Sequence, residues 1–102
     1  MQKKHRNKIL EEAEKIYSEL YNTQFNNYQI YNSLFQFQLK LKKYAEAKKI
    51  VEHQIQISNN KVNLYGDLGS VYFLMGDEKL AAQTWNDALK LEPENPFAFR
   101  TI

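Results

Sequence analysis

Residues 68–93 read LGSVYFLMGDEKLAAQTWNDALKLEP, and small and bulky residues recur there at fixed distances. Small residues and large aromatic residues alternate along the stretch: Gly69, Tyr72, Ala81, Trp85 and Ala88. A small residue lets two helix backbones approach each other, and a bulky one fills the space beside the contact. The stretch therefore predicts two closely packed helices, with Tyr72 and Trp85 as core side chains.

The stretch lies in a unit of 34 residues, 62–95, which holds two segments of helical periodicity. In the first segment, apolar side chains recur at i, i+3, i+7 and i+10: Tyr65, Leu68, Tyr72 and Met75. The second segment reads LAAQTWNDALKL. Between them, Gly76 can end a helix in the left-handed conformation and Asp77 can cap the next one. Residues 62–75 and 78–91 are therefore predicted helices.

The same period extends back through the chain. One step back, residues 28–61 place similar residues at equivalent positions: Tyr31 for Tyr65, Leu34 for Leu68 and Ala47 for Ala81. A further step places Ala13 and Tyr17 where Ala81 and Trp85 stand. The chain is thus predicted to be all-α, a helix–turn–helix repeat with about five helices: 3–22, 28–41, 44–57, 62–75 and 78–91.

These residues resemble a known family, the tetratricopeptide repeat. The pattern of that family has an aromatic residue, leucine, glycine and tyrosine on a first helix, then alanine, an aromatic residue and alanine on a second, and a closing proline. In this chain those places hold Tyr65, Leu68, Gly69, Tyr72, Ala81, Trp85, Ala88 and Pro93. The resemblance implies a solenoid of stacked helix pairs that forms a right-handed superhelix.

The resemblance also suggests how one domain over residues 1–102 is organised. We expect an N-terminal helix or half repeat (1–27), a degenerate repeat (28–61), a typical repeat (62–95) and the start of a further helix (96–102). In the degenerate repeat, Phe35 stands where Gly69 stands in the typical one, and we expect it to disturb the helix spacing. We interpret the chain as a piece of a longer repeat array.

Helix phase predicts which side chains line the concave wall of such a solenoid. They lie on the first helix of each pair, off the core stripe: Asn32, Ser33, Gln36, Lys40, Asn63, Asp67, Ser70, Phe73 and Leu74. Amide and hydroxyl groups can hydrogen-bond a peptide, and Phe73 with Leu74 can hold one apolar anchor. The predicted function is therefore protein–protein interaction as a scaffold or adaptor, with a peptide or partner segment on this wall.

Self-association is the alternative function. The apolar residues Phe97, Phe99 and Ile102 and the long first helix offer apolar surface through which two copies can form a homodimer.

RNA binding is a lesser alternative. Lysines gather around Tyr44, in a stretch that faintly resembles the RNA-binding pentatricopeptide repeats: Lys40, Lys42, Lys43, Lys48 and Lys49. Residues 28–61 hold six basic and two acidic side chains, but residues 62–102 hold three and six. Because phosphate binding requires basic side chains along the whole groove, nucleic acid is not an expected partner.

A membrane is not an expected partner either. The first helix is amphipathic, but its apolar side is better explained by docking on residues 28–41. No apolar run is long enough to cross a bilayer and no signal peptide is recognisable, so a cytoplasmic location is favoured.

The chain carries no catalytic or metal-binding pattern. It has no cysteine, and its two histidines, His5 and His53, stand far apart without a ligand-type or catalytic partner. No nucleotide-binding glycine motif occurs. We therefore expect a protein without enzymatic activity, cofactor or metal.

Overall fold

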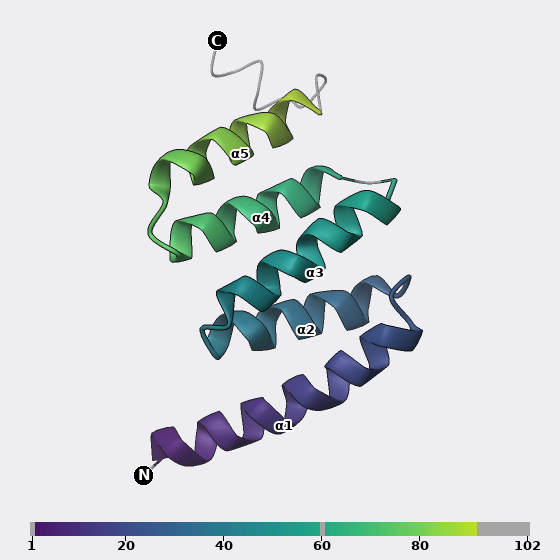
Figure 1. Ribbon diagram of the computed structural model, residues 1–102, viewed down its shortest axis with the longest axis vertical. Coiled ribbons are helices and arrows are strands. Elements are labelled where there is room, and N and C mark those ends of the chain that lie inside the picture. Colours follow the sequence, from purple (N-terminus) through teal and green to yellow (C-terminus); the bar gives the residue numbers. More distant parts are fainter. Residues whose placement is uncertain (1, 60, 92–102) are drawn as a thin grey trace. The chain divides into compact units, whose positions relative to one another are not determined.

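The computed structural model describes residues 2–59 and 61–91, with side chains from residue 6 onward. Five helices follow one another in this part of the chain: α1 (Gln2–Thr23), α2 (Tyr28–Lys40), α3 (Tyr44–Ile57), α4 (Val62–Leu74) and α5 (Glu78–Lys90) (Figure 1). Their bounds agree with the predicted helices to within one residue at each end, and the described residues contain no strand. The protein is therefore all-α and built from helix pairs.

The chain divides into two compact units, Met1–Ile50 and Val51–Ile102, with the boundary inside α3. In the first unit α1 packs on α2, and in the second α4 packs on α5. Several residues singled out in the sequence lie outside the described part, or have side chains outside it: His5, Pro93, Phe97, Phe99 and Ile102.

The turn between α2 and α3 and the turn between α4 and α5 have the same backbone hydrogen bonds. Three amide groups close the first turn: Leu41 donates to Phe37, Lys42 to Leu39 and Lys43 to Gln38. Their equivalents 34 residues later close the second: Met75 donates to Val71, Gly76 to Phe73 and Asp77 to Tyr72. The 34-residue period therefore holds for the backbone hydrogen bonds of the turns as well as for the side-chain types.

Each of these turns places one residue in the left-handed conformation. Gly76 has φ 92°, and Lys42, its equivalent one period earlier, has φ 61°. Glycine adopts this conformation without steric cost, whereas the Cβ of lysine crowds the following carbonyl. The next helix, α5, is capped by Asp77, whose Oδ1 accepts a hydrogen bond from Leu80 N at 3.0 Å. The predicted end and cap at Gly76 and Asp77 are both observed.

The first unit buries aromatic side chains between α1 and α2. The rings of Tyr17 and Phe37 meet across the two helices, with centroids 5.4 Å apart. On the buried side of α2, Tyr31 and Phe35 stack at 5.9 Å, and Phe35 is only 2% exposed. α2 is an uninterrupted helix through Phe35, so this large residue is accommodated in the core without breaking the helix.

An ion pair joins α1 to the turn before α3. Lys43 Nζ lies 2.9 Å from Glu14 Oε1, and the hydrogen bond to this carboxylate raises the pKa of Lys43. A lysine with a raised pKa in the folded state contributes stability at neutral pH and loses that contribution as the pH rises through the raised pKa. Because the lysine side chain is 42% exposed, solvent screens the pair and its contribution is small.

Gln38 is a polar residue in the core of the first unit. Its side chain is 3% exposed, and its Oε1 has no hydrogen-bond partner. Gln38 stands one period before Tyr72, where the typical repeat has an aromatic ring. A buried acceptor without a partner loses its hydration and gains nothing in return.

The second unit buries a different stripe of α4 from the one that the sequence predicts. The buried apolar side chains of α4 are Leu64, Leu68 and Val71, spaced i, i+4 and i+7. Of the predicted stripe, only Leu68 is buried: Tyr65 and Tyr72 are half-buried and Met75 is 51% exposed. The difference arises because α4 contacts Trp85 of α5 through a second side, at Gly69. The apolar part of the surface of α4 is therefore wider than one stripe of side chains.

We predict that Lys42→Gly raises the free energy of unfolding by about 0.5–1 kcal/mol, because glycine removes the strain of the left-handed backbone. Urea unfolding followed by circular dichroism measures the change. Gln36→Gly, at an exposed position inside α2, is the control and should lower stability, since glycine weakens a helix interior. A loss of stability in both variants would contradict the strain at Lys42.

We predict that Gln38→Met stabilises the protein by about 1 kcal/mol, since methionine keeps the length of the side chain and removes the unpaired acceptor. The midpoint of thermal unfolding should rise in proportion. Gln36→Met, on the exposed side of the same helix, is the control and should leave the midpoint unchanged. An equal or lower midpoint for Gln38→Met would show that the buried amide is satisfied in solution.

Candidate functional site

Two aromatic rings are in contact on the exposed surface of the α4–α5 pair. The centroids of Phe73 on α4 and Trp85 on α5 lie 6.0 Å apart, and their planes are tilted by 35°. Phe73 is 50% exposed and Trp85 is 38% exposed. Exposed aromatic rings provide large apolar contact area with few rotatable bonds, which makes them frequent binding hot spots.

The backbone of α4 holds the indole of Trp85 in one orientation. The indole Nε1–H donates a hydrogen bond to the carbonyl oxygen of Gly66 at 3.1 Å. A Cβ atom at Gly69 would overlap the ring, 2.8 Å from Cε2 and closer still to Nε1 and Cδ1. Glycine at this position is therefore required for Trp85 to lie against α4 and beside Phe73.

The carbonyl of Gly66 also accepts a hydrogen bond from the side chain of Ser70. The hydroxyl oxygen lies 3.1 Å from the carbonyl oxygen, so the hydroxyl proton is used within α4. A hydroxyl that donates its proton keeps two lone pairs. Ser70 can therefore offer an acceptor, rather than a donor, to a bound molecule.

Trp85 differs from the prediction that it is a buried core residue. Val51, its equivalent one period earlier, is 0% exposed, whereas more than a third of Trp85 is accessible. The backbone of α4 covers one side of the indole, and the other side is open. Trp85 is thus a partly exposed residue held against α4, and not the fully buried core residue that the repeat pattern predicts.

The predicted wall residues of the second unit line up along α4. Asn63, Asp67, Ser70 and Leu74 follow the helical spacing i, i+4, i+7 and i+11, and Phe73 lies beside Leu74. Asn63, Phe73 and Leu74 are exposed, while Asp67 and Ser70 are half-buried. We call these five residues together with Trp85 the α4 surface. It combines an amide, a carboxylate, a hydroxyl and an apolar end.

The predicted wall residues of the first unit lie on α2. Gln36 and Lys40 are exposed, and Asn32 and Ser33 are half-buried. All four lie off the buried side of α2, which carries Tyr31, Leu34, Phe35 and Gln38. A continuous groove that joins these residues to the α4 surface stays a prediction.

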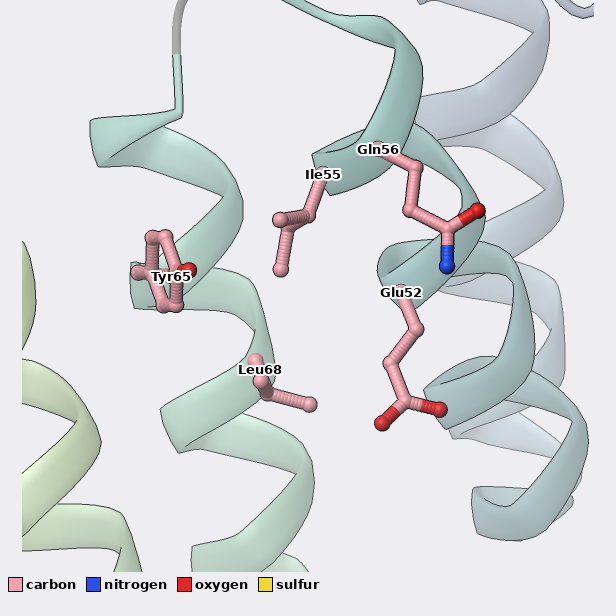
Figure 2. Close-up of a pocket in the computed structure, with 5 residues that line it drawn as sticks. All are labelled: Glu52, Ile55, Gln56, Tyr65 and Leu68. Carbon is pink, nitrogen blue, oxygen red and sulfur yellow. The ribbon is translucent and has the colours of Figure 1, made fainter.

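A cleft of about 380 Å³ opens between the C-terminal part of α3 and α4 (Figure 2). It is lined by Glu52, Ile55, Gln56, Tyr65 and Leu68. In Figure 2 the side chains of Glu52 and Leu68 extend into the cleft from the two helices. Tyr65 lies two residues after Asn63, about 200° around the helix, so the cleft and the α4 surface lie on different sides of α4.

This cleft was not predicted from the sequence, because helical spacing places Tyr65 and Leu68 on one core stripe. The available signal was the pair Glu52 and Gln56, two polar residues one helical turn apart that flank the apolar Ile55.

The described residues contain no arrangement that suggests metal or membrane chemistry. Within residues 2–59 and 61–91, no group of three or more histidine, cysteine or acidic side chains can hold a metal ion. None of the helices in the same residues is both long and apolar enough to cross a membrane.

Comparisons with known proteins point to the same part of the chain. The sequence model of the tetratricopeptide repeat matches residues 62–95, which contain α4, α5 and the whole α4 surface. A TPR repeat-containing protein of Methanocaldococcus jannaschii is 32% identical over 56 residues, which are 55% of this chain and 10% of that relative. This chain thus corresponds to a small part of the relative's length. No solved structure matches the chain.

We predict that Gly69→Ala lowers the free energy of unfolding by about 1–3 kcal/mol, because the added methyl group displaces the indole from α4. Gly66→Ala is a matched control in the same helix, since a Cβ there meets nothing within 4 Å. That variant should gain about 0.5–1 kcal/mol from helix propensity. Urea unfolding followed by the fluorescence of Trp85, the one tryptophan of the chain, measures both. Equal gains in the two variants would show that the contact does not constrain α5.

Proposed function

The chain belongs to the tetratricopeptide repeat family, and we propose that it is a scaffold or adaptor that binds a peptide segment of another protein on the α4 surface. Repeats of this family are generally protein–protein interaction modules. The observation that carries the proposal is the exposed Phe73–Trp85 pair, whose indole is already held by the Gly66 carbonyl. A binding surface that is ordered before the partner arrives avoids part of the entropy cost of association.

The α4 surface has the chemistry of a peptide site. An apolar side chain of the peptide covers Phe73 and Leu74, where the largest apolar area is exposed. The amide of Asn63 can donate to and accept from the peptide backbone, and Ser70 can accept from a peptide N–H. We infer a peptide that carries one apolar anchor side chain for Phe73 and Leu74. Its backbone N–H and C=O groups are free to hydrogen-bond Ser70 and Asn63.

The charge of this part of the chain favours a neutral or basic partner. Residues 62–102 hold six acidic and three basic side chains, and Asp67 lies in the middle of the α4 surface. A carboxylate on the partner would meet a like charge there, which costs binding energy. An acidic peptide is therefore disfavoured.

A second copy of the chain is the other candidate occupant. Leu89 near the end of α5 and Leu91 just after it are 44% and 48% exposed, close in sequence to Trp85. Two such surfaces can form a two-fold contact. Light scattering across a range of concentrations distinguishes this case, since a homodimer dissociates on dilution and a peptide-binding monomer does not change mass.

We predict that peptides selected from a displayed random library bind the α4 surface and shift the fluorescence of Trp85 to shorter wavelength. Phe73→Ala should weaken binding at least about tenfold, because it removes the anchor site. Met75→Ala is the matched control: Met75 is as exposed as Phe73 but lies about 200° around the helix. Binding that is insensitive to Phe73→Ala would overturn the proposed site.

A further inference from the structure

The middle of the α4 surface presents two side chains that accept hydrogen bonds. Asp67 contributes a carboxylate, and an ionised carboxylate accepts hydrogen bonds without donating any. Ser70 follows three residues later, so the two side chains are neighbours on the surface of the helix. Both residues are half-buried. A ligand group that approaches one of them therefore also meets the other.

The hydroxyl group of Ser70 is an acceptor because its proton is already committed. Its Oγ donates to the carbonyl oxygen of Gly66 at 3.1 Å, and Trp85 Nε1 donates to the same oxygen at 3.1 Å. The two lone pairs of this carbonyl are thus both in use. Ser70 keeps two lone pairs of its own, so it can accept from a peptide N–H and from a second donor.

The charge of the α4 surface comes from Asp67, which is the one charged side chain between Val62 and Leu74. Lys61, the nearest basic residue along the chain, lies about 9 Å away along the axis of α4 and about 120° around it. The neighbouring helix α5 carries two acidic and two basic side chains, so it does not cancel the charge of Asp67.

The half-buried position strengthens the effect of this carboxylate. A charge pair that is partly buried is screened less by salt than an exposed pair. Asp67 also has an interaction within the protein. The two oxygens of a carboxylate offer about four lone-pair positions, so a ligand can be accepted beside a protein group.

Lysine and arginine side chains have the chemistry that matches these two acceptors. Each carries several N–H donors, no acceptor and a positive charge. The fork of an arginine guanidinium can donate to a carboxylate and a hydroxyl oxygen at once. An acidic side chain is repelled, and a neutral amide brings an acceptor that finds no donor at Asp67 or Ser70.

The apolar anchor determines where the basic residue stands in the peptide. Along the axis of α4, Leu74 lies about 10 Å beyond Asp67 and about 6 Å beyond Ser70. An extended peptide advances about 3.3 Å per residue. The basic residue is therefore two or three positions from the anchor residue.

We propose that Asp67 and Ser70 form a subsite for a lysine or arginine side chain of the bound peptide, two or three residues from its apolar anchor. The subsite rests on the proposed function, because it belongs to the same α4 surface. Phe73 and Leu74 hold the peptide through its anchor, and the subsite selects which peptides are held.

Peptide selection from a displayed random library against two forms of the full chain, wild type and Asp67→Asn, tests the subsite. With the wild type, lysine and arginine should be enriched at least about fivefold at two or three positions from the apolar residue. With Asp67→Asn the apolar residue should persist and the basic enrichment should disappear, because asparagine keeps the size of the side chain and removes its charge. Circular dichroism verifies that the variant folds.

A selected peptide, synthesised with arginine at the basic position and again with citrulline, measures the size of the effect. Citrulline has nearly the same shape and no charge. By fluorescence anisotropy, it should weaken binding to the wild type at least about fivefold and binding to Asp67→Asn less than about twofold. The comparison on the wild type needs no protein variant, so it decides the question even if Asp67→Asn does not fold.

Asp87→Asn is the matched control. Asp87 is an exposed acidic residue of α5, about 200° around that helix from Trp85. This variant should keep the preference for arginine over citrulline. Loss of the preference here as well as in Asp67→Asn would assign it to the overall charge of the second unit and overturn the subsite.

Two further results would overturn the proposal, and they separate it from the proposed function. Selected peptides without a basic preference, or equal affinities for the arginine and citrulline peptides, would remove the subsite while peptide binding on the α4 surface stands. A library that yields no binding peptide would remove both.

Discussion

The contact of the Trp85 indole with the backbone of α4 at Gly69 is the constraint on which the second unit depends. Any side chain at Gly69 would occupy the space of the ring. Because the ring lies so close, its N–H reaches the Gly66 carbonyl and its edge reaches Phe73. One missing side chain thus determines the approach of two helices, the orientation of the tryptophan and the exposed aromatic pair proposed as a binding anchor.

The earlier repeat keeps the same backbone period with different side chains. Where the later repeat has Gly69 and Trp85, the earlier one has Phe35 and Val51, and both of these are buried. The large residue thus stands on the first helix of the earlier repeat and on the second helix of the later one. The turn of the earlier repeat also tolerates Lys42 in a left-handed conformation that Gly76 adopts freely. The two repeats therefore share a helical period and a turn geometry without sharing these residue types.

In a repeat protein each helix packs against neighbours on two sides. A helix that is covered on one side therefore leaves apolar residues exposed on the other. α4 is covered on its Gly69 side and on its Leu64–Leu68 side, and its exposed side combines polar residues with Phe73 and Leu74. α1 is covered on one side, so Ile9 and Ile16 face solvent. Asp67, in the middle of the α4 surface, disfavours acidic partners there.

The sequence by itself determined the elements whose signals are local. Helix period, the turn at Gly76 and the cap at Asp77 depend on residues a few positions apart, and the helix bounds were predicted to within one residue. The family pattern was equally visible. Which side of each helix is covered depends on the tertiary structure: Trp85 and Met75 are exposed, Leu64 and Val71 are buried, and Ile9 and Ile16 on α1 are exposed. Burial depends on which neighbour lies against a residue, and helical spacing specifies a side of the helix without specifying that neighbour.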